Sequence, residues 1–362
     1  MDKFSKQLNL KMKTQENSTT KQFQSTHDMK PEIKINLNSQ LKLLFGNNNN
    51  LPVNPSIDFI KNPSNTCNET NKTDVLMLVN SAVPNFHRRK AIRETFGQKI
   101  DSFKYRHKLV FLLGLSDDQR VMQKINAEMI AHDDLLLGTF NDTYRNLTLK
   151  GIMGLRWTKQ FCPEVDFVVK VDDDIFVNLV QLQTFLSDEF FSSNSSTGSV
   201  STGSGNTGSG SIGSESTGSG GGRIGHRIAC SVQTNGSSAI HRGNDTKWPV
   251  DKSLFVGWSH YPFDFCNGYF VVMSGGLIRE LSAAVRVTPV FWIDDVYLFG
   301  MLPASVNDVT FVNIDTRITH WYSKAKSCFR NVKKSKCEYI AVQAGHREPA
   351  EVRDYYKFWE KI

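Results

Sequence analysis

The most restrictive feature of the chain is an apolar run that ends in three consecutive carboxylates, DFVVKVDDDIFVN, residues 166–178. A run of this length, rich in β-branched valine, predicts a buried strand of a parallel sheet. Alternate side chains of an extended segment share a face, so Asp172 and Asp174 are expected on one side and Asp173 on the other. Carboxylates this close raise each other's pKa unless a cation lies between them.

Similar strands alternate with helices along the ordered part of the sequence. Short apolar runs at 73–81 and 108–114 predict buried strands, and HRRKAIRETFG, 87–97, predicts a helix that stops at its glycine. A longer helix is expected at 142–161, directly before the strand that carries the carboxylates. This alternation is typical of an α/β domain with a mainly parallel central sheet flanked by helices. Ligands of such sheets collect at the carboxyl ends of the strands.

Two segments differ from this pattern in composition. Residues 1–71 are rich in Lys, Asn, Gln and Ser and are expected to form a disordered polar stem, which leaves 72–362 as one catalytic domain. The Gly/Ser/Thr tract at about 187–228 is expected to be an insertion into that domain, with a linker between domains as the alternative. No apolar run of about 20 residues occurs, so an anchor in the membrane is expected outside this chain.

Charge and cysteine usage restrict the partners and the compartment. The net charge is +7, but the Lys and Arg residues are spread along the chain, so a nucleic-acid partner is not expected. The 6 cysteines include no CxxC pair, which argues against a zinc ribbon or a redox site. N-x-S/T sequons such as those at Asn141 and Asn146 favour a secretory route, although an Asn- and Ser-rich chain also makes them by chance.

Several blocks of sequence, taken in order, resemble those of the β-1,3-galactosyltransferase family, which includes β-1,3-N-acetylglucosaminyltransferases. The resemblance covers residues 73–362 apart from the Gly/Ser/Thr tract. It implies a GT-A fold, a UDP-sugar donor, Mn²⁺ (or Mg²⁺) as cofactor and an inverting transfer to the 3-hydroxyl of an acceptor sugar. The blocks are RRKAIRETFG (88–97), FLLG (111–114), FNDTYRNLTLKGIMGLRWTKQFCP (140–163), VVKVDDDIFVN (168–178), KWPV (247–250), YPFDFCNGYFVVMS (261–274) and DDVYLFG (294–300).

The resemblance also suggests which residues hold the metal ion. Asp174 is expected as a direct ligand, and Asp172 as a residue that reaches the metal through water or binds the ribose of the donor. His346 matches the C-terminal histidine of the family and is expected to be a second metal ligand. Oxygen ligands with one imidazole suit Mn²⁺. Without the resemblance, a lone histidine in a loop is more often a surface residue.

The segment IDDVYLFG matches the family block that carries the catalytic base. Inversion by a single displacement needs one general base near the acceptor hydroxyl, and Asp295 aligns with that residue. Asp294 is expected to bind acceptor or sugar hydroxyls. The structural alternative is the start of a helix capped by aspartate.

The donor is expected to meet basic and acidic side chains. Arg89 and Arg93 resemble the family's R-x-x-I-R pair and, as planar donors, suit a diphosphate or uracil. A solvated helix face is the alternative. Lys150, Asp172 and Asp173 complete the predicted donor-binding set.

These observations predict a hexosyltransferase that moves galactose, or N-acetylglucosamine, to a glycan acceptor on a glycoprotein or glycolipid. The resemblance places it at the Golgi membrane, with the catalytic domain in the lumen. A non-catalytic carbohydrate-binding protein with the same fold is the alternative. A phosphotransferase is less favoured, because no Gly-rich phosphate loop is present.

Overall fold

A computed structural model describes residues 54–63, 66–67, 73–100, 103–190, 225–234, 261, 263–330, 337–344 and 350–362. Apart from Tyr261, they belong to one compact unit that comprises Leu51–Thr234 and Phe263–Ile362. Most of the predicted stem and most of the Gly/Ser/Thr tract lie outside the described residues, so both interpretations stay predictions.

The sheet strands and the helices alternate through most of this unit. The strands are β1 (Phe59–Lys61), β2 (Val75–Asn80), β3 (His107–Leu115), β4 (Leu135–Asn141), β5 (Phe167–Asp172), β6 (Ile175–Val177), β7 (Arg227–Gln233), β8 (Phe265–Ser274), β9 (Thr310–Asn313), β10 (Ile318–Thr319) and β11 (Ala341–Gln343). The α-helices are α3 (Phe86–Arg93), α4 (Gln119–His132), α5 (Leu147–Phe161), α6 (Leu179–Thr184), α7 (Gly275–Ala284), α8 (Asp294–Val296), α9 (Leu302–Ala304), α10 (Tyr322–Arg330) and α11 (Ala350–Trp359). Single turns of 3₁₀ or π type are Tyr144–Asn146, Phe185–Glu189, Tyr297–Met301 and Asp315–Arg317.

The main sheet has 8 strands in the order β1-β4-β3-β2-β5-β8-β7-β9. Strands β4, β3, β2 and β5 are mutually parallel, and β7 is parallel to β9. Strand β8 runs antiparallel to both of its neighbours. The predicted α/β class, with a mainly parallel central sheet flanked by helices, is confirmed. The strands and helices predicted before the Gly/Ser/Thr tract are present with shifted ends, except that residues 166–178 form two strands, β5 and β6, separated by a turn and placed in different sheets.

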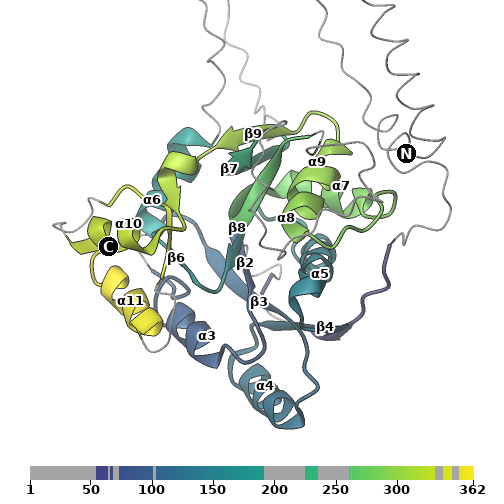
Figure 1. Cartoon of the computed structure of the whole chain (residues 1–362), viewed down its shortest axis with the longest axis horizontal. Helices are drawn as coiled ribbons and strands as arrows, with labels where there is room; N and C mark the ends of the chain where they lie inside the picture. Colours follow the sequence, from purple (N-terminus) through teal and green to yellow (C-terminus); the bar gives the residue numbers. More distant parts are fainter. Residues whose placement is uncertain are drawn as a thin grey trace, which may run out of the picture. The chain divides into compact units, whose positions relative to one another are not determined.

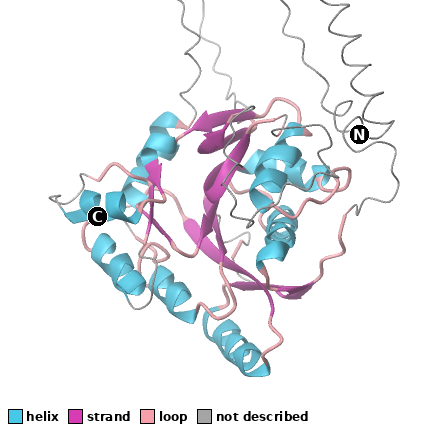
Figure 2. Cartoon of the chain, viewed as in Figure 1, coloured by secondary structure: helices cyan, strands magenta, loops and turns pink. Residues whose placement is uncertain are grey.

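Helices cover both faces of the main sheet. Helices α5, α7 and α8 lie on one side and α3, α4 and α11 on the other (Figure 1), and Figure 2 shows the strands as the layer between them. Alternate residues of β2 explain this arrangement. Val75, Met77 and Val79 belong to the core cluster that includes Ile92 of α3. Leu78, on the opposite face, lies only 3.3 Å from where a Cβ on Gly154 of α5 would be, so the helix packs closely there.

The segment before residue 72 adds a strand that the sequence analysis assigned to the stem. Residues Phe59–Lys61 form β1, which pairs antiparallel with β4 at the edge of the sheet. Nearby, Cys67 forms a disulfide with Cys162, which follows α5 directly. The folded domain therefore begins before residue 72, the predicted boundary. The sequence FIK is too short for its periodicity to separate a strand from a coil.

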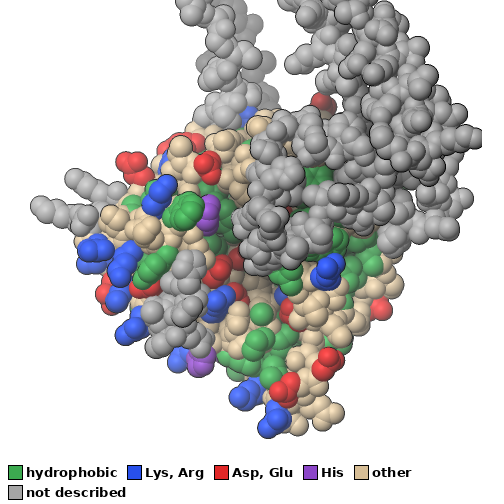
Figure 3. All heavy atoms as spheres, in the orientation of Figure 1, with side chains coloured by type: hydrophobic (Ala, Val, Ile, Leu, Met, Phe, Trp, Pro, Cys, Tyr) green, Lys and Arg blue, Asp and Glu red, His purple; other side chains and the backbone are tan. Residues whose placement is uncertain are grey.

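Two further observations concern the surface and the helices of the described residues. Basic side chains on the face shown in Figure 3 are scattered and do not gather in one patch. In the described part of the chain, no helix combines the length and the apolar character that crossing a membrane requires.

Candidate active site

The three consecutive carboxylates lie where β5 ends. Asp172 is the last residue of β5, and a turn through Asp173 and Asp174 leads into β6. Asp173 is buried, whereas Asp172 and Asp174 are half-buried. The burial alternates as the sequence predicts, although Asp173 and Asp174 belong to the turn and not to an extended strand. The carboxylates of Asp172 and Asp174 are therefore the ones that solvent can reach.

The buried carboxylate of Asp173 is bonded to the segment that follows β2. It accepts hydrogen bonds from Ser81 Oγ at 2.6 Å, Asn85 Nδ2 at 2.9 Å and Arg88 Nη1 at 2.7 Å. Its main-chain carbonyl accepts a further bond of 2.7 Å from Tyr355 Oη of α11. These contacts favour a structural role for Asp173, which fixes the turn after β5, over the predicted contact with a donor.

A lysine that sequence reasoning did not select completes the polar end of β5. Lys170 Nζ donates to Asp172 Oδ1 at 2.6 Å and to the carbonyl of Gly268 in β8. Burial lowers the pKa of Lys170, but the nearby carboxylates of Asp172, Asp294 and Asp295 outweigh this effect and raise it. The site thus contains a fixed positive charge. Its signal in the sequence is a lysine inside an otherwise apolar strand.

The predicted base and its neighbour begin the short helix α8. Asp294 and Asp295 are half-buried, and they lie close enough to Lys170 for the three charges to interact. Burial, with the adjacent Asp294 carboxylate, raises the pKa of Asp295 to about 8, although Lys170 and the Gly268 amide oppose the shift. Burial also raises the pKa of Asp294. A carboxyl group with a pKa near neutrality is suited to general base catalysis.

Gly268 connects the two acidic parts of the site. Its amide donates to the carboxylate of Asp295, and its carbonyl accepts from Lys170. A Cβ on Gly268 would lie 2.0 Å from Asp295 Oδ1, so this close approach requires glycine. No local sequence pattern shows the pairing, because Gly268 is 98 residues from Lys170 in the chain.

The two predicted donor-binding arginines instead form an ion-pair network inside the protein. Arg89 is fully buried and donates to Glu128 and to the carbonyls of residues 82 and 83. Arg93 bonds both oxygens of Asp134, at 2.7 and 2.8 Å, and Glu128 at 2.7 Å. These contacts favour a role in holding α3 against α4. They also disfavour the alternative of a solvated helix face.

Lys150 is likewise engaged within the protein. Its Nζ donates to the carbonyl of Ser81 at 2.7 Å and to Asp142 at 2.8 and 3.0 Å. Asp142 also accepts from the amide of Gly114 at 2.9 Å. Because Lys150 is buried with these partners, it is suited to holding the ends of β2, β3 and β4 together.

One of the predicted metal ligands, His346, lies outside the described residues. The structure describes this segment up to Ala344, two residues before His346. The amide of Ala344 donates a hydrogen bond of 2.9 Å to the carbonyl of Asp174. Among the described residues, no three His, Cys, Asp or Glu side chains converge as a metal site. The accessible oxygens of Asp172 and Asp174 nevertheless have the chemistry that a hard divalent cation prefers.

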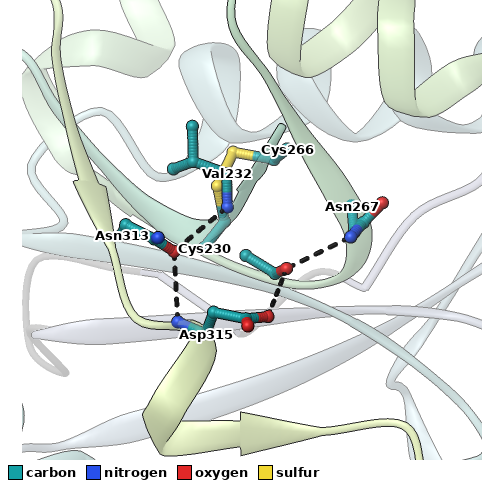
Figure 4. Close-up of a disulfide and its surroundings, with 7 residues drawn as sticks. Cys230, Val232, Cys266, Asn267, Asn313 and Asp315 are labelled. Atoms are coloured by element: carbon teal, nitrogen blue, oxygen red, sulfur yellow. Dashed lines mark hydrogen bonds between the residues drawn. A yellow bond between two sulfur atoms is a disulfide. The ribbon is translucent and has the colours of Figure 1, made fainter. Parts of the chain in front are cut away.

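A disulfide braces the strand that carries Gly268. Cys230 of β7 forms a disulfide with Cys266 of β8. Beside it, Ser231 Oγ donates to Asp315 Oδ1 at 2.7 Å and accepts from Asn267 Nδ2 at 3.1 Å (Figure 4). These contacts join β7 and β8 to the turn after β9.

Fold and site together define an α/β domain whose strand ends form an acidic, ligand-accessible edge. Residues 87–209 match the family model described as Galactosyltransferase. The chain is 38% identical over 139 residues to beta-1,3-galactosyltransferase 1 of Mus musculus, a match that covers 38% of this chain and 42% of that protein. It is 27% identical over 242 residues to beta-1,3-galactosyltransferase 5 of Gorilla gorilla gorilla, covering 67% of this chain and 69% of the relative.

The Galactosyltransferase match and these relatives support the resemblance to β-1,3-galactosyltransferases that the sequence blocks predicted. The first of these matches spans 42% of the relative's length, less than half.

Two solved structures resemble the chain more weakly. A glycosyltransferase involved in the glycosylation of the major capsid of PBCV-1 gives a TM-score of 0.37 at 9% identity, covering 78% of this chain and 98% of that chain. The galactosyltransferase LgtC, with donor and acceptor sugar analogs, gives 0.36 at 10% identity, covering 79% and 96%.

Proposed function

We propose that the chain is a metal-dependent, inverting hexosyltransferase of GT-A type. It would move galactose, or N-acetylglucosamine, from a UDP-sugar to the 3-hydroxyl of an acceptor sugar in β-1,3 linkage. The observation that carries the proposal is Asp295, a half-buried carboxyl group whose pKa is raised to about 8 beside the end of β5. The resemblance to β-1,3-galactosyltransferases supports galactose as the sugar.

Each acidic group of the site has a distinct role in this proposal. Asp295 takes the proton from the acceptor hydroxyl while that oxygen attacks the sugar and the UDP departs from the opposite face. Asp294 orients hydroxyl groups of the acceptor or the transferred sugar. Lys170 and Gly268 are positioning residues, which hold Asp172 and Asp295 at fixed places along the strand ends.

The donor side of the site fits a divalent cation, Mn²⁺ or Mg²⁺. Asp174 would hold it, with Asp172 and His346 as further ligands. Bound there, the cation would act as a Lewis acid that stabilises the departing diphosphate. Arg89, Arg93, Lys150 and Asp173 would contribute by fixing the segments around the donor, since each of them is bonded to other side chains of the protein.

A glycan on a glycoprotein or glycolipid in the Golgi lumen would be the acceptor. The disulfides Cys67–Cys162, Cys230–Cys266 and Cys328–Cys337 support this compartment, because disulfides form and persist along the secretory route. The exposed sequon at Asn141 is accessible to glycosylation there.

The test is UDP release by the full chain with Mn²⁺, UDP-galactose or UDP-N-acetylglucosamine, and β-linked Gal, GalNAc and GlcNAc acceptors. Asp295→Asn and Asp174→Asn are each expected to slow acceptor-dependent release by about a hundredfold or more, with Tm nearly unchanged. The wild-type rate should rise with pH up to about 8, because only the ionised Asp295 carboxylate accepts a proton. Asp117→Asn, a change on the exposed surface, is the control.

Wild-type rates in the Asp295→Asn variant would remove the role of that residue. If the wild-type protein binds a UDP-sugar but transfers to no acceptor, the non-catalytic carbohydrate-binding protein becomes the better interpretation.

A further inference from the structure

Asn80, the last residue of β2, has a buried side chain without hydrogen bonds. It is 6% exposed, and neither its amide nitrogen nor its amide oxygen has a partner among the residues that the structure describes. A buried carboxamide without partners costs free energy, and an apolar side chain of similar volume would avoid that cost. The unpaired amide therefore indicates a ligand that both accepts and donates a hydrogen bond.

The strand register places Asn80 beside the acidic residues of the site. Asn80 is the register partner of Asp172 on the neighbouring parallel strand β5. Partners on adjacent strands project from the same face of a sheet, so both side chains lie on the face opposite Val79 and the α3 core. Asn80 therefore lies next to Asp172, whose half-buried side chain is partly accessible.

The order of strands then indicates which part of a donor meets Asn80; this step rests on the proposed function. Strands β2, β5 and β8 are neighbours and carry Asn80, Asp172 and Gly268 in that order, with Asp295 against Gly268. A UDP-hexose is a linear molecule of nucleoside, diphosphate and hexose. Its hexose must lie near Asp295 and its diphosphate near Asp172, which leaves the nucleoside over β2.

We propose that Asn80 binds the uracil ring of the UDP-sugar donor. Uracil presents an N–H donor between two carbonyl acceptors. A carboxamide presents one donor and one acceptor in the same plane, so the two edges are complementary. Asn80 is a donor-binding residue in this assignment and takes no part in proton transfer.

Isothermal titration of the full chain with UDP and with inorganic pyrophosphate, each with Mn²⁺, tests the assignment. Asn80→Leu is expected to raise the Kd for UDP by about tenfold or more and to leave the Kd for pyrophosphate unchanged. The Tm of the ligand-free Asn80→Leu variant should equal or exceed that of the wild type, because no protein hydrogen bond is lost. Asn80→Ala provides the same UDP comparison if leucine prevents folding.

Asn178→Leu is the matched control, because Asn178 is also a buried asparagine but one with partners. Its side chain bonds the carbonyl of Cys337 at 3.3 Å and the amide of Gln181 at 3.3 Å. This variant should lower Tm and leave the Kd for UDP unchanged.

Three outcomes would overturn the inference. An unchanged Kd for UDP in both Asn80 variants would mean that water, or a residue outside the described ones, satisfies the amide. Equal weakening of UDP and pyrophosphate would place Asn80 against the diphosphate. A wild-type protein that binds no UDP would overturn the proposed function as well, and this result is recognisable before any variant is made.

Discussion

At the scale of single residues, the site depends on a glycine, because no side chain would fit at that position. Gly268 brings its amide to Asp295 and its carbonyl to Lys170, and the space that a Cβ would need is filled by the Asp295 carboxylate. Lys170 in turn binds Asp172. The positions of Asp172 and Asp295 are therefore linked through one peptide unit of β8.

Gly268→Ala should disturb this link directly. The added methyl group would lie 2.0 Å from Asp295 Oδ1, so the carboxylate has to move and its bond to the amide is lost. We expect the kcat for transfer to fall by about tenfold or more while the KM for the donor changes little, with a stability loss of about 1–3 kcal/mol. Steady-state kinetics and urea unfolding measure these effects.

Gly276→Ala is the control for that substitution, because a Cβ there meets nothing within 4 Å. It lies in α7, where alanine is expected to stabilise the helix by about 0.5–1 kcal/mol without changing kcat. Equal kinetic effects of the two substitutions would contradict the role given to Gly268.

Sequence reasoning selects the acidic residues of the candidate site but does not show what holds them. Asp172, Asp174 and Asp295 could be selected because carboxylates at the end of an apolar strand and in a family block are visible locally. Lys170 and Gly268 were not selected, since their contact joins strands far apart in the sequence. Local patterns show which residues are unusual, but the partners come from the fold.

At the scale of elements, the same limit explains the arginines of α3. Their spacing of four residues correctly predicted one helical face. The sequence analysis predicts that this face binds the donor. In the structure the two arginines bond Glu128 of α4 and Asp134, which follows α4. The partners belong to another helix, so the spacing alone could not show whether the arginines bind a ligand or the protein.

Removing Arg89 should therefore destabilise the fold. Arg89→Ala leaves the carboxylate of Glu128 with Arg93 alone and removes the hydrogen bonds that Arg89 donates to the carbonyls of residues 82 and 83. Loss of one partner from a buried ion pair costs about 3–5 kcal/mol, which urea unfolding measures. Lys90→Ala, on the exposed side of the same helix, is the control and should change stability by no more than about 0.5 kcal/mol. Full stability with selective loss of donor affinity would instead restore Arg89 to the donor site.

Three strands of the main sheet were predictable from their composition. β2, β3 and β5 are apolar runs, and the sequence predicts each of them. The strands of the small sheet, β10, β11 and β6, have only 2 or 3 residues each and carry no periodic signal. They matter for function nonetheless, because β11 pairs with β6 directly after the carboxylates.

At the scale of the whole molecule, two disulfides close loops of very different length. Cys67–Cys162 joins the segment after β1 to the end of α5 across 95 residues, whereas Cys328–Cys337 closes a loop of 9. In the chain-entropy model, the longer loop restricts the unfolded chain more.

Replacing each disulfide by two alanines should show this difference. The model predicts losses of about 5 kcal/mol for Cys67→Ala with Cys162→Ala and about 3 kcal/mol for Cys328→Ala with Cys337→Ala. Urea unfolding of both double variants measures the losses. Equal losses would show that packing around the sulfur atoms, and not loop length, sets the contribution.

The shared peptide of β8 also bears on how this protein can evolve. A shift of β8 by one residue would replace Gly268 by a residue with a side chain and move the contacts of Lys170 and Asp295 together. A mutation that shifts β8 therefore changes the surroundings of Lys170 and of Asp295 at the same time. We expect new acceptor preferences to arise by changes in loops that leave this strand in place, because descendants that shift the strand lose both halves at once.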